Sequence, residues 1–541
     1  MKRKLLINTI KKIFFSTPMY DFIISKNVSA KVKHFLNESW EGDLENGKNF
    51  INGYINFYGE TLNYKKSIWE KNSATSKWKE ALHSFDWIKD LKLVGAGKSG
   101  VFVRKEILEW IEIHNSWSQL EWRSDILGKR ICALLGNLNF FFSSADEKFQ
   151  QILLKSICKQ GNHLIKNNLY DVLGFHRIYA VKGIIALSVS LNVFRKFKSA
   201  GIKLLLKEIK YQVFLDGCHY LKSPSKHIEF LLNLIDIKNY LATLNIEVPK
   251  EINQSIMSMS VAAKFFRHPN GSLTTFNNSN HVSLKKINQI IIRSNSKKKV
   301  SSYQNIAGFN RIYKNRLYFI MDCGNPVRED VYAGSLSFEL SMGKYQIIVN
   351  CGSPYINNKK WAEAMKSSAA HSTANIDNIN SSDIIFNNND KNKRVAKVWS
   401  KLKKRDGSYW IDSAHSGYKN YFGLIHSRKI HIDTSKKIVR GQDCFSKSPS
   451  EYLKIPKKYS IRFHLHPDLQ TNVTRSKKKA LIKLPDGSGW EFLCSEPKIE
   501  INESIYLGEK QRIIKNNYIL IKDSLFPDKK IKWLFRQIQK Y

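Results

Sequence analysis

The stretch DGCHYLKSPSKHIEFLL, residues 216–232, concentrates side chains that can carry protons and positive charge. It contains two histidines, a tyrosine and two lysines: His219, Tyr220, Lys222, Lys226 and His227. Imidazole and phenol groups are common general acids and bases near neutral pH. The stretch continues directly into an apolar helical pattern, so it forms either one wall of an active site or a polar turn that caps a helix.

The elements that would position this turn have helical periodicity. Segment 146–165 has apolar residues at helical spacing, and segments 176–194, 199–214 and 223–244 follow at short intervals. Ser223 is a suitable N-cap and Pro224 suits the first helical position. Successive helices with short connections predict stacked antiparallel helix pairs.

The pattern changes to strands near residue 265. The segments 316–324, 335–352, 422–445 and 481–495 have the pattern strand, turn, strand, with turn residues such as Met342-Gly343, Thr434-Ser435 and Pro485-Asp486-Gly487. Many short strands with regular turns predict a sandwich of antiparallel sheets. We therefore expect an α+β protein with a helical domain over residues 1–275 and a β domain over residues 276–541.

The composition favours a polyanionic partner. The net charge is +42 and the isoelectric point is near 9.8, which attracts acidic polysaccharide, nucleic acid or anionic membrane. A bias toward Lys, Asn and Ile codons would produce the same excess. Because the chain has no C2H2 spacing, no Gly-rich RNA-binding signature and no concentrated basic helix, we expect no nucleic-acid partner.

Three further patterns limit the class of protein. The seven cysteines are scattered and form no C-x-x-C, which argues against a disulfide framework or a structural zinc knot. The apolar run GIIALSVSLNVF is about half the ~20 residues of a membrane span, so no integral span is expected. The basic N-terminus is interrupted by Lys11 and Lys12 and has no clean cleavage site, so we expect no standard signal peptide.

Several segments, in this order, resemble the heparinase II/III family of polysaccharide lyases: QGNHLIKNN, LDGCHYLKSPSKHIEFLLNLIDI, FFRHPNGSLTTFNN, YAGSLSFELSMGKYQIIVNCG, AAHSTANID and YSIRFHLHP. The resemblance runs from about residue 120 to the C-terminus. It implies an N-terminal incomplete α/α toroid, a C-terminal antiparallel β-sandwich, and β-elimination on polysaccharides that contain uronic acid.

Five residues are expected to act in catalysis, and four of them stand at positions that the resemblance matches. Asn162 and His163 match the family pair that approaches the substrate carboxylate, whose neutralisation makes the C5 proton acidic. His227 matches the last residue of the family element D-G-x-x-x-x-x-S-P-x-Y-H. The catalytic tyrosine of that element falls on Lys226, whose resting form is a charged ammonium, and Tyr220 is the nearby phenol that could replace it.

The β half departs from the family at its metal-binding positions. The two histidines of the family H-x-H element fall on Asp330 and Tyr332, and an acidic ligand falls on Asn350. Only His371 keeps the family type. Because zinc in proteins is bound by several imidazole, thiolate or carboxylate ligands, one retained ligand is poor evidence for it, and we expect no metal and no other cofactor.

Five residues are expected to bind substrate: His219, Arg267, His268, His371 and His415. Arg267 and His268 match a family stretch near the predicted domain boundary, where they would either contact substrate or hold the junction. His464 and His466 alternate on one strand face and form either a ligand pair or an ordinary polar face.

The main functional hypothesis is a lyase that cleaves an anionic polysaccharide by β-elimination. The alternative is a polysaccharide-binding protein that has lost elimination chemistry and handles capsule or surface polymer, because the tyrosine and histidine positions are altered. The resemblance implies a location in the cell envelope or periplasm, with the cytoplasm as the alternative. The sequence assigns no particular polysaccharide and no oligomeric state.

Overall fold

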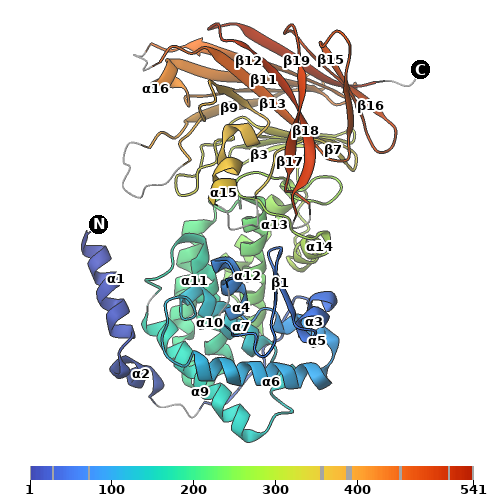
Figure 1. Ribbon diagram of the computed structural model, residues 1–541. Helices are drawn as coiled ribbons and strands as arrows, with labels where there is room; N and C mark the ends of the chain where they lie inside the picture. The colour runs from blue at the N-terminus through green and yellow to red at the C-terminus, as the bar shows by residue number, and fades with distance from the viewer. Residues whose placement is uncertain are drawn as a thin grey trace. The chain divides into compact units, whose positions relative to one another are not determined.

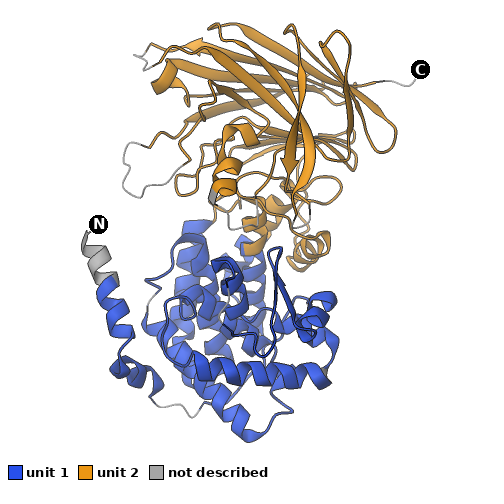
Figure 2. Cartoon of the chain, in the orientation of Figure 1, with its two compact units in different colours: residues 1–212, 230–256 blue, residues 213–229, 257–541 orange. Residues whose placement is uncertain are grey.

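The computed structural model describes residues 2–26, 30–70, 73–167, 169–353, 359–384, 393–449, 454–509 and 512–538. The chain divides into two compact units, which Figure 2 shows in different colours. The first unit contains residues 1–212 and 230–256, and the second contains residues 213–229 and 257–541. The turn at 216–227 therefore belongs to the same unit as the β strands.

The first unit is mainly helical (Figure 1). In chain order its elements are α1 (Lys2–Phe15), α2 (Pro18–Ser25), α3 (Leu44–Ile51), β1 (Tyr54–Phe57), β2 (Glu60–Asn63), α4 (Ser76–His83), α5 (Ile88–Val94), α6 (Ala96–Ile113), α7 (Ser124–Gly136), α8 (Leu138–Phe141), α9 (Glu147–Lys166), η1 (Gly174–His176), α10 (Arg177–Ser190), η2 (Asn192–Phe197) and α11 (Lys198–Gln212). Helices α12 (Pro224–Ala242) and α13 (Lys250–Phe265) continue from one unit into the other. The four helical segments expected from periodicity are confirmed.

Helix α9 illustrates how the sequence forms these helices. The Asp146 side chain accepts a hydrogen bond from the main chain of Phe149, which satisfies one of the free N–H groups at the helix start. Phe149, Leu153, Ile157 and Leu164 recur at helical spacing and are buried. Packing of this apolar face fixes the rotation of the helix, and therefore the direction in which its polar residues point.

Helix α12 begins at Pro224 as expected, but its cap differs from the prediction. The Ser223 carbonyl accepts from His227 N–H (2.8 Å), whereas the Ser223 hydroxyl makes no hydrogen bond within the described part of the chain. The N–H of Ser225 donates instead to the side chain of Ser279 (3.2 Å). A distant segment therefore supplies the cap that Ser223 was expected to provide.

The second unit contains two large antiparallel sheets. One sheet has the strand order β14-β15-β16-β19-β12-β11-β10-β9, and the other has β17-β18-β13-β7-β6-β5-β4-β3 with β8 paired to β13. The strands are β3 (Tyr303–Ile306), β4 (Phe309–Lys314), β5 (Leu317–Asp322), β6 (Phe338–Met342), β7 (Tyr345–Val349), β8 (Ala374–Ile376), β9 (Val398–Arg405), β10 (Ser408–His415), β11 (Leu424–Asp433), β12 (Ile438–Lys447), β13 (Lys458–Leu465), β14 (Gln470–Val473), β15 (Lys479–Lys483), β16 (Gly489–Cys494), β17 (Glu500–Tyr506), β18 (Ile514–Ser524) and β19 (Lys530–Gln537).

The short helical elements of this unit are α14 (Leu284–Arg293), α15 (Lys359–Lys366), η3 (Ser368–Ala370) and α16 (Lys419–Phe422). The three turns expected from sequence lie between β6 and β7, between β11 and β12, and between β15 and β16. The predicted fold class, a helical N-terminal part and an antiparallel C-terminal part, is confirmed.

The two sheets differ in how many of their faces are buried. In β5, Leu317, Phe319 and Met321 join the core shared by both sheets, while Tyr318 and Ile320 point the other way into a second core with the end of α13. Both faces of β5 are therefore covered. Strand β11 alternates between buried and more exposed residues instead, as expected for a sheet with one face toward solvent.

None of the described helices combines the length and the apolar character that crossing a membrane requires.

Candidate functional site

The first candidate site lies on α9, in the helical unit. Lys159 precedes Asn162 by three positions and His163 by four, so its side chain lies beside both on the helix surface. The Asn162 amide donates to the Ile24 carbonyl (2.8 Å), and Lys159 Nζ lies 2.6 Å from an Asp21 carboxylate oxygen. These groups form a set of hydrogen-bond donors suited to an anionic or oxygen-rich ligand.

His163 is fully buried. Its Nδ1 lies 2.7 Å from the Tyr20 hydroxyl, and its ring contacts those of Phe15, Tyr20 and Trp122. Burial lowers the pKa of His163 to about 3. The imidazole is therefore neutral at physiological pH.

The turn at 216–227 is held by its own polar groups. Asp216 accepts from the N–H groups of Cys218 (3.0 Å) and Ala307 (2.7 Å), which fixes the start of the turn. Lys222 has a positive φ of 52° and donates from Nζ to the Asn325 carbonyl (2.9 Å). These bonds fix the backbone from which His219, Tyr220 and Lys226 project.

His219 and His227, expected respectively to bind substrate and to act in catalysis, are in direct contact. The main-chain N–H of His219 donates to His227 Nδ1 (3.2 Å), and His227 Nε2 donates to the Met259 carbonyl (2.8 Å). Both ring nitrogens of His227 are therefore engaged by backbone. Burial lowers the pKa of His227 to about 4 and that of His219 well below its usual value, so both rings are neutral.

Tyr220 and Lys226 of the same turn are both partly exposed. The Tyr220 ring packs against the His219 ring, with centroids 4.9 Å apart. Lys226 Nζ pairs with the Glu229 carboxylate one helical turn later (2.9 Å). This ion pair engages the Lys226 ammonium with a neighbouring side chain of the same helix.

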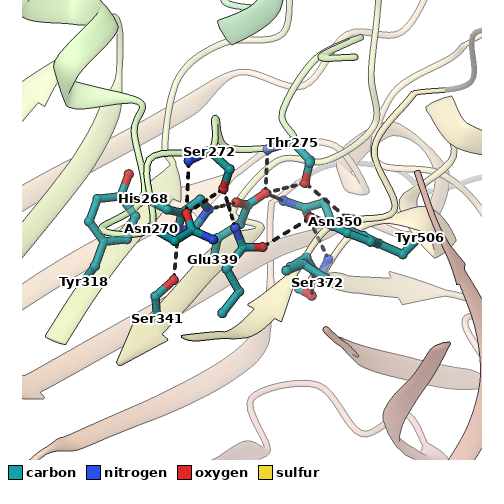
Figure 3. A network of polar contacts seen from close by, with 12 residues as sticks. His268, Asn270, Ser272, Thr275, Tyr318, Glu339, Ser341, Asn350, Ser372 and Tyr506 are labelled. Carbon is teal, nitrogen blue, oxygen red and sulfur yellow. Dashed lines mark hydrogen bonds and ion pairs between the residues drawn. The ribbon is translucent and has the colours of Figure 1, made fainter. Parts of the chain in front are cut away.

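His268 belongs to a buried polar network that Figure 3 shows from close by. Its Nε2 donates to Glu339 Oε2 (2.8 Å) and its Nδ1 lies 2.8 Å from Ser341 Oγ. The other Glu339 oxygen accepts from Thr275 N–H, Thr275 Oγ1 and Asn350 Nδ2. This carboxylate is fully satisfied by protein donors, as a buried charge requires. Sequence reasoning paired neither Glu339 nor Thr275 with His268.

Arg267, the neighbour of His268, is anchored by protein contacts. Its Nε donates to the Gly271 carbonyl (2.8 Å), and its guanidinium also contacts the Asn288 side chain. These contacts tie the segment after α13 to α14. The expected substrate-binding role of Arg267 and His268 stays a prediction.

The family's metal position does not fit a divalent cation in this chain. Asn350 Oδ1 accepts from Ser372 N–H (3.0 Å), while its Nδ2 donates to Glu339. Burial raises the pKa of Tyr332 far above its usual range, so a phenolate ligand is disfavoured. The Asp330 carboxylate is engaged by Lys366 (2.6 Å) and Asn278 (3.2 Å). His371 has both ring nitrogens unbonded within the described residues. One imidazole does not make a stable site.

His415 lies in a separate buried network in the sandwich. Gly417 N–H donates to its Nδ1 (3.0 Å), and its Nε2 lies 3.0 Å from His426 Nδ1. His426 Nε2 in turn donates to Asp443 (2.7 Å). Both ring nitrogens of His415 are thus occupied by protein groups, and its expected contact with substrate stays a prediction.

The two alternating histidines near the end of β13 have different partners. His464 Nδ1 lies 2.9 Å from Ser504 Oγ, and its Nε2 donates to the Ala369 carbonyl (2.9 Å). His466 lies near Asp468 and Glu509, with one potential ligand atom from each residue all within 4.8 Å of one another. Asp468 N–H donates to His466 Nδ1 (3.3 Å), so the ring directs Nε2 toward Glu509, 3.3 Å away.

The structure thus brings Asn162 and His163 together in the helical unit, and His219, Tyr220, Lys226 and His227 together in the other unit. The sequence reasoning missed Tyr20, Asp21 and Lys159. Lys159 is detectable from its helical spacing to Asn162 and His163. No local pattern could have indicated Tyr20 or Asp21, because they are more than a hundred residues away from α9 in the chain.

The buried histidines predict a loss of stability in acid. Their ordinary pKa is 6.5, and burial lowers it to about 3 in His163 and His464 and to about 4 in His227 and His371. Between pH 6.5 and 4 the unfolded chain therefore binds protons that the folded chain does not. The free energy of unfolding should fall as pH falls through this window, by about 1 kcal/mol per pH unit for each histidine.

Urea unfolding at several pH values between 7.5 and 4.5 measures this dependence. The variant His163→Gln keeps a polar side chain that does not titrate, and it should reduce the slope. His34→Gln is the matched control because His34 is exposed. An unchanged slope in His163→Gln would contradict the assignment of His163 as a buried neutral group.

Two family models together cover almost all of the chain. The model described as heparinase II/III N-terminus matches residues 16–303, and the model described as heparinase II/III-like, C-terminal matches residues 297–534. The boundary between the models falls between α14 and β3, where helices give way to strands.

Two curated proteins are similar in sequence. FtsZ-localized protein C of Caulobacter vibrioides is 24% identical over 514 residues, which is 91% of this chain and 88% of that protein. Heparin-sulfate lyase of Pedobacter heparinus is 24% identical over 220 residues, which is 38% of this chain and 32% of that protein.

Solved structures share the fold. Heparan sulfate lyase HepC from Pedobacter heparinus superposes with a TM-score of 0.62 and 16% identity, covering 92% of this chain and 83% of its own. A heparinase III structure superposes with a TM-score of 0.69 and 13% identity, covering 87% and 78%. The architecture is therefore the α/α toroid followed by a β-sandwich, and with both family models matched in order the chain belongs to the heparinase II/III family.

Proposed function

We propose that this protein is a lyase that cleaves an anionic polysaccharide containing uronic acid by β-elimination. The observation that carries the proposal is the donor set on α9, within a chain of this family. Lys159, Asn162 and His163 present an ammonium, an amide and an imidazole at neighbouring positions on the helix surface. Such donors neutralise a substrate carboxylate and stabilise the enolate-like charge that develops when the C5 proton leaves.

Proton transfer is assigned to the turn at 216–227. Elimination needs a base for the C5 proton and an acid for the bridging oxygen. Tyr220 is our candidate base, because Lys226 is paired with Glu229 and both ring nitrogens of His227 are engaged. The Lys226 ammonium is our candidate acid for the leaving oxygen.

The charge of the chain supports an acidic polymer as substrate. A net charge of +42 raises the local concentration of polyanions and speeds their association. For the location, we propose the cell envelope, with the cytoplasm as the alternative.

A purely binding function is the second candidate. It is favoured by the substitutions at family positions: Lys226 for tyrosine, and Asp330 and Tyr332 for the two histidines. Asp330 is paired with Lys366 (2.6 Å), an ion pair that a histidine at this position would not form.

An absorbance assay separates the two functions. Elimination creates an unsaturated uronate that absorbs in the near ultraviolet, so we expect absorbance to rise with heparan sulfate, chondroitin sulfate, alginate or a bacterial capsular polysaccharide. Tyr220→Phe should lower the rate by about 100-fold or more. Tyr54→Phe, at an exposed tyrosine in β1, is the matched control. Binding of a polymer without any unsaturated product would contradict the lyase and support the binding function.

A further inference from the structure

The N-terminal helix α2 covers the donor set of α9. Each of the three donors has a partner from α2: the Asp21 carboxylate on Lys159, the Ile24 carbonyl on Asn162, and the Tyr20 hydroxyl on His163. The distances are 2.6, 2.8 and 2.7 Å. Figure 1 shows α2 and α9 at the same edge of the helical unit.

The same segment closes the surroundings of His163. Three aromatic rings contact the imidazole: Tyr20 of α2, Phe15 at the end of α1, and Trp122 just before α7. Tyr20 is 2% exposed and His163 is fully buried. Phe15 also packs on Trp117, with ring centroids 5.8 Å apart. No ligand can reach His163 Nδ1 while Tyr20 occupies this position.

The groups that α2 presents are of the same kind as those of an acidic sugar. A uronate residue offers a carboxylate, hydroxyl groups and ring or bridging oxygens. Helix α2 offers the Asp21 carboxylate to Lys159, the Tyr20 hydroxyl to His163 and the Ile24 carbonyl to Asn162. Lys159 is almost completely buried, whereas the Asp21 side chain is 35% exposed.

We propose that α2 is an autoinhibitory segment, which occupies the carboxylate subsite on α9 and leaves it when an acidic polysaccharide binds. The inference rests on the proposed function, because it takes Asn162 and His163 as the groups that receive the substrate carboxylate. The ligand can bind only those molecules in which α2 has moved away. The apparent affinity is therefore the intrinsic affinity multiplied by the fraction of such molecules. Weakening the contacts of α2 should therefore strengthen substrate binding.

The test uses the full-length chain and two conservative changes. The double variant Tyr20→Phe, Asp21→Asn removes the hydroxyl and the charge while keeping the volumes of both side chains. Met19→Ala is the matched control, because Met19 lies on α2 and is 60% exposed. The ligands are hexasaccharides of heparan sulfate and of alginate, each also in a carboxyl-reduced form that lacks the uronate charge.

Two measurements are made on each variant: apparent affinity for the hexasaccharides, and hydrogen exchange of the amides in residues 19–25. In the double variant we expect about five- to tenfold tighter binding of a hexasaccharide that carries carboxylates. In the native chain this ligand should accelerate exchange in α2 several-fold. The carboxyl-reduced ligand should change neither quantity, and Met19→Ala should match the native chain.

The outcomes separate the inference from the proposed function. Unchanged affinity in the double variant, together with unchanged exchange in α2 on adding ligand, overturns the inference even where unsaturated product forms. If the carboxylate ligand displaces α2 but no unsaturated product forms, the inference is upheld and the proposed lyase activity is contradicted. Absence of binding by the native chain and by the double variant overturns the inference.

Discussion

Replacing Asn162 with alanine should lower the turnover rate of polysaccharide elimination by about 100- to 1,000-fold. This is the usual cost of removing one fixed donor that stabilises charge in a transition state. Asn162 is only half-buried, and its amide donates a hydrogen bond to the Ile24 carbonyl. The substitution therefore leaves the core of the helical unit intact, and the loss should appear in kcat.

Steady-state kinetics on the unsaturated product measure this effect. Asn162→Ala also removes one contact that holds α2, so KM should stay level or fall while kcat decreases. Asn239→Ala is the control, because Asn239 is an exposed residue of α12 in the same unit. A kcat within about twofold of the native value would contradict the role of Asn162 in neutralising the substrate carboxylate.

Replacing Asp443 with alanine should reduce the stability of the β-sandwich by about 3–5 kcal/mol, because the change leaves a buried arginine without its counter-charge. Asp443 accepts hydrogen bonds from His426 Nε2 (2.7 Å), Arg428 Nε (2.8 Å) and Trp533 Nε1 (2.8 Å). All the side chains in this group are buried. The Arg428 guanidinium and His426 hold the pKa of Asp443 well below its usual range.

Arg428 connects the two sheets of the sandwich. The residue lies on β11 and donates to the carbonyls of Leu336 and Ser372 (2.9 Å each), which lie in the segments before β6 and before β8. Removal of Asp443 would therefore weaken the attachment of one sheet to the other, in addition to leaving Arg428 unpaired.

Guanidinium unfolding followed by tryptophan fluorescence measures the stability change. Asp412→Ala is the matched control, since Asp412 is exposed on β10 of the same sheet, and it should change stability by no more than about 0.5 kcal/mol. A loss below about 1 kcal/mol in Asp443→Ala would show that the group contributes little to the sandwich.

The elements were predictable because their signals are local. Phe149, Leu153 and Ile157 recur at helical spacing in α9, and the Pro485-Asp486-Gly487 turn separates β15 from β16. Such patterns depend on the few residues inside one element. The N-cap predicted at Ser223 was wrong. The side chain of Ser279, from a distant segment, accepts the hydrogen bond at the start of α12 instead.

The candidate site was predictable only in part. Asn162 and His163 were found because they are adjacent in a motif, and Lys226 was recognised as a departure for the same reason. The sequence could not indicate that both ring nitrogens of His227 would bond to backbone at His219 and Met259. Those bonds depend on where the end of α13 lies in the folded unit.

The sequence therefore determined the fold class, the order of the elements and the residue types available for chemistry, because apolar spacing and turn residues act over short distances along the chain. The tertiary structure decided which of those residues have partners. It placed Tyr20 and Asp21 of α2 in contact with α9, paired His268 with Glu339, and enclosed His415 beside His426. These pairs form because packing brings distant segments within hydrogen-bond range, and burial then requires each polar group to be satisfied.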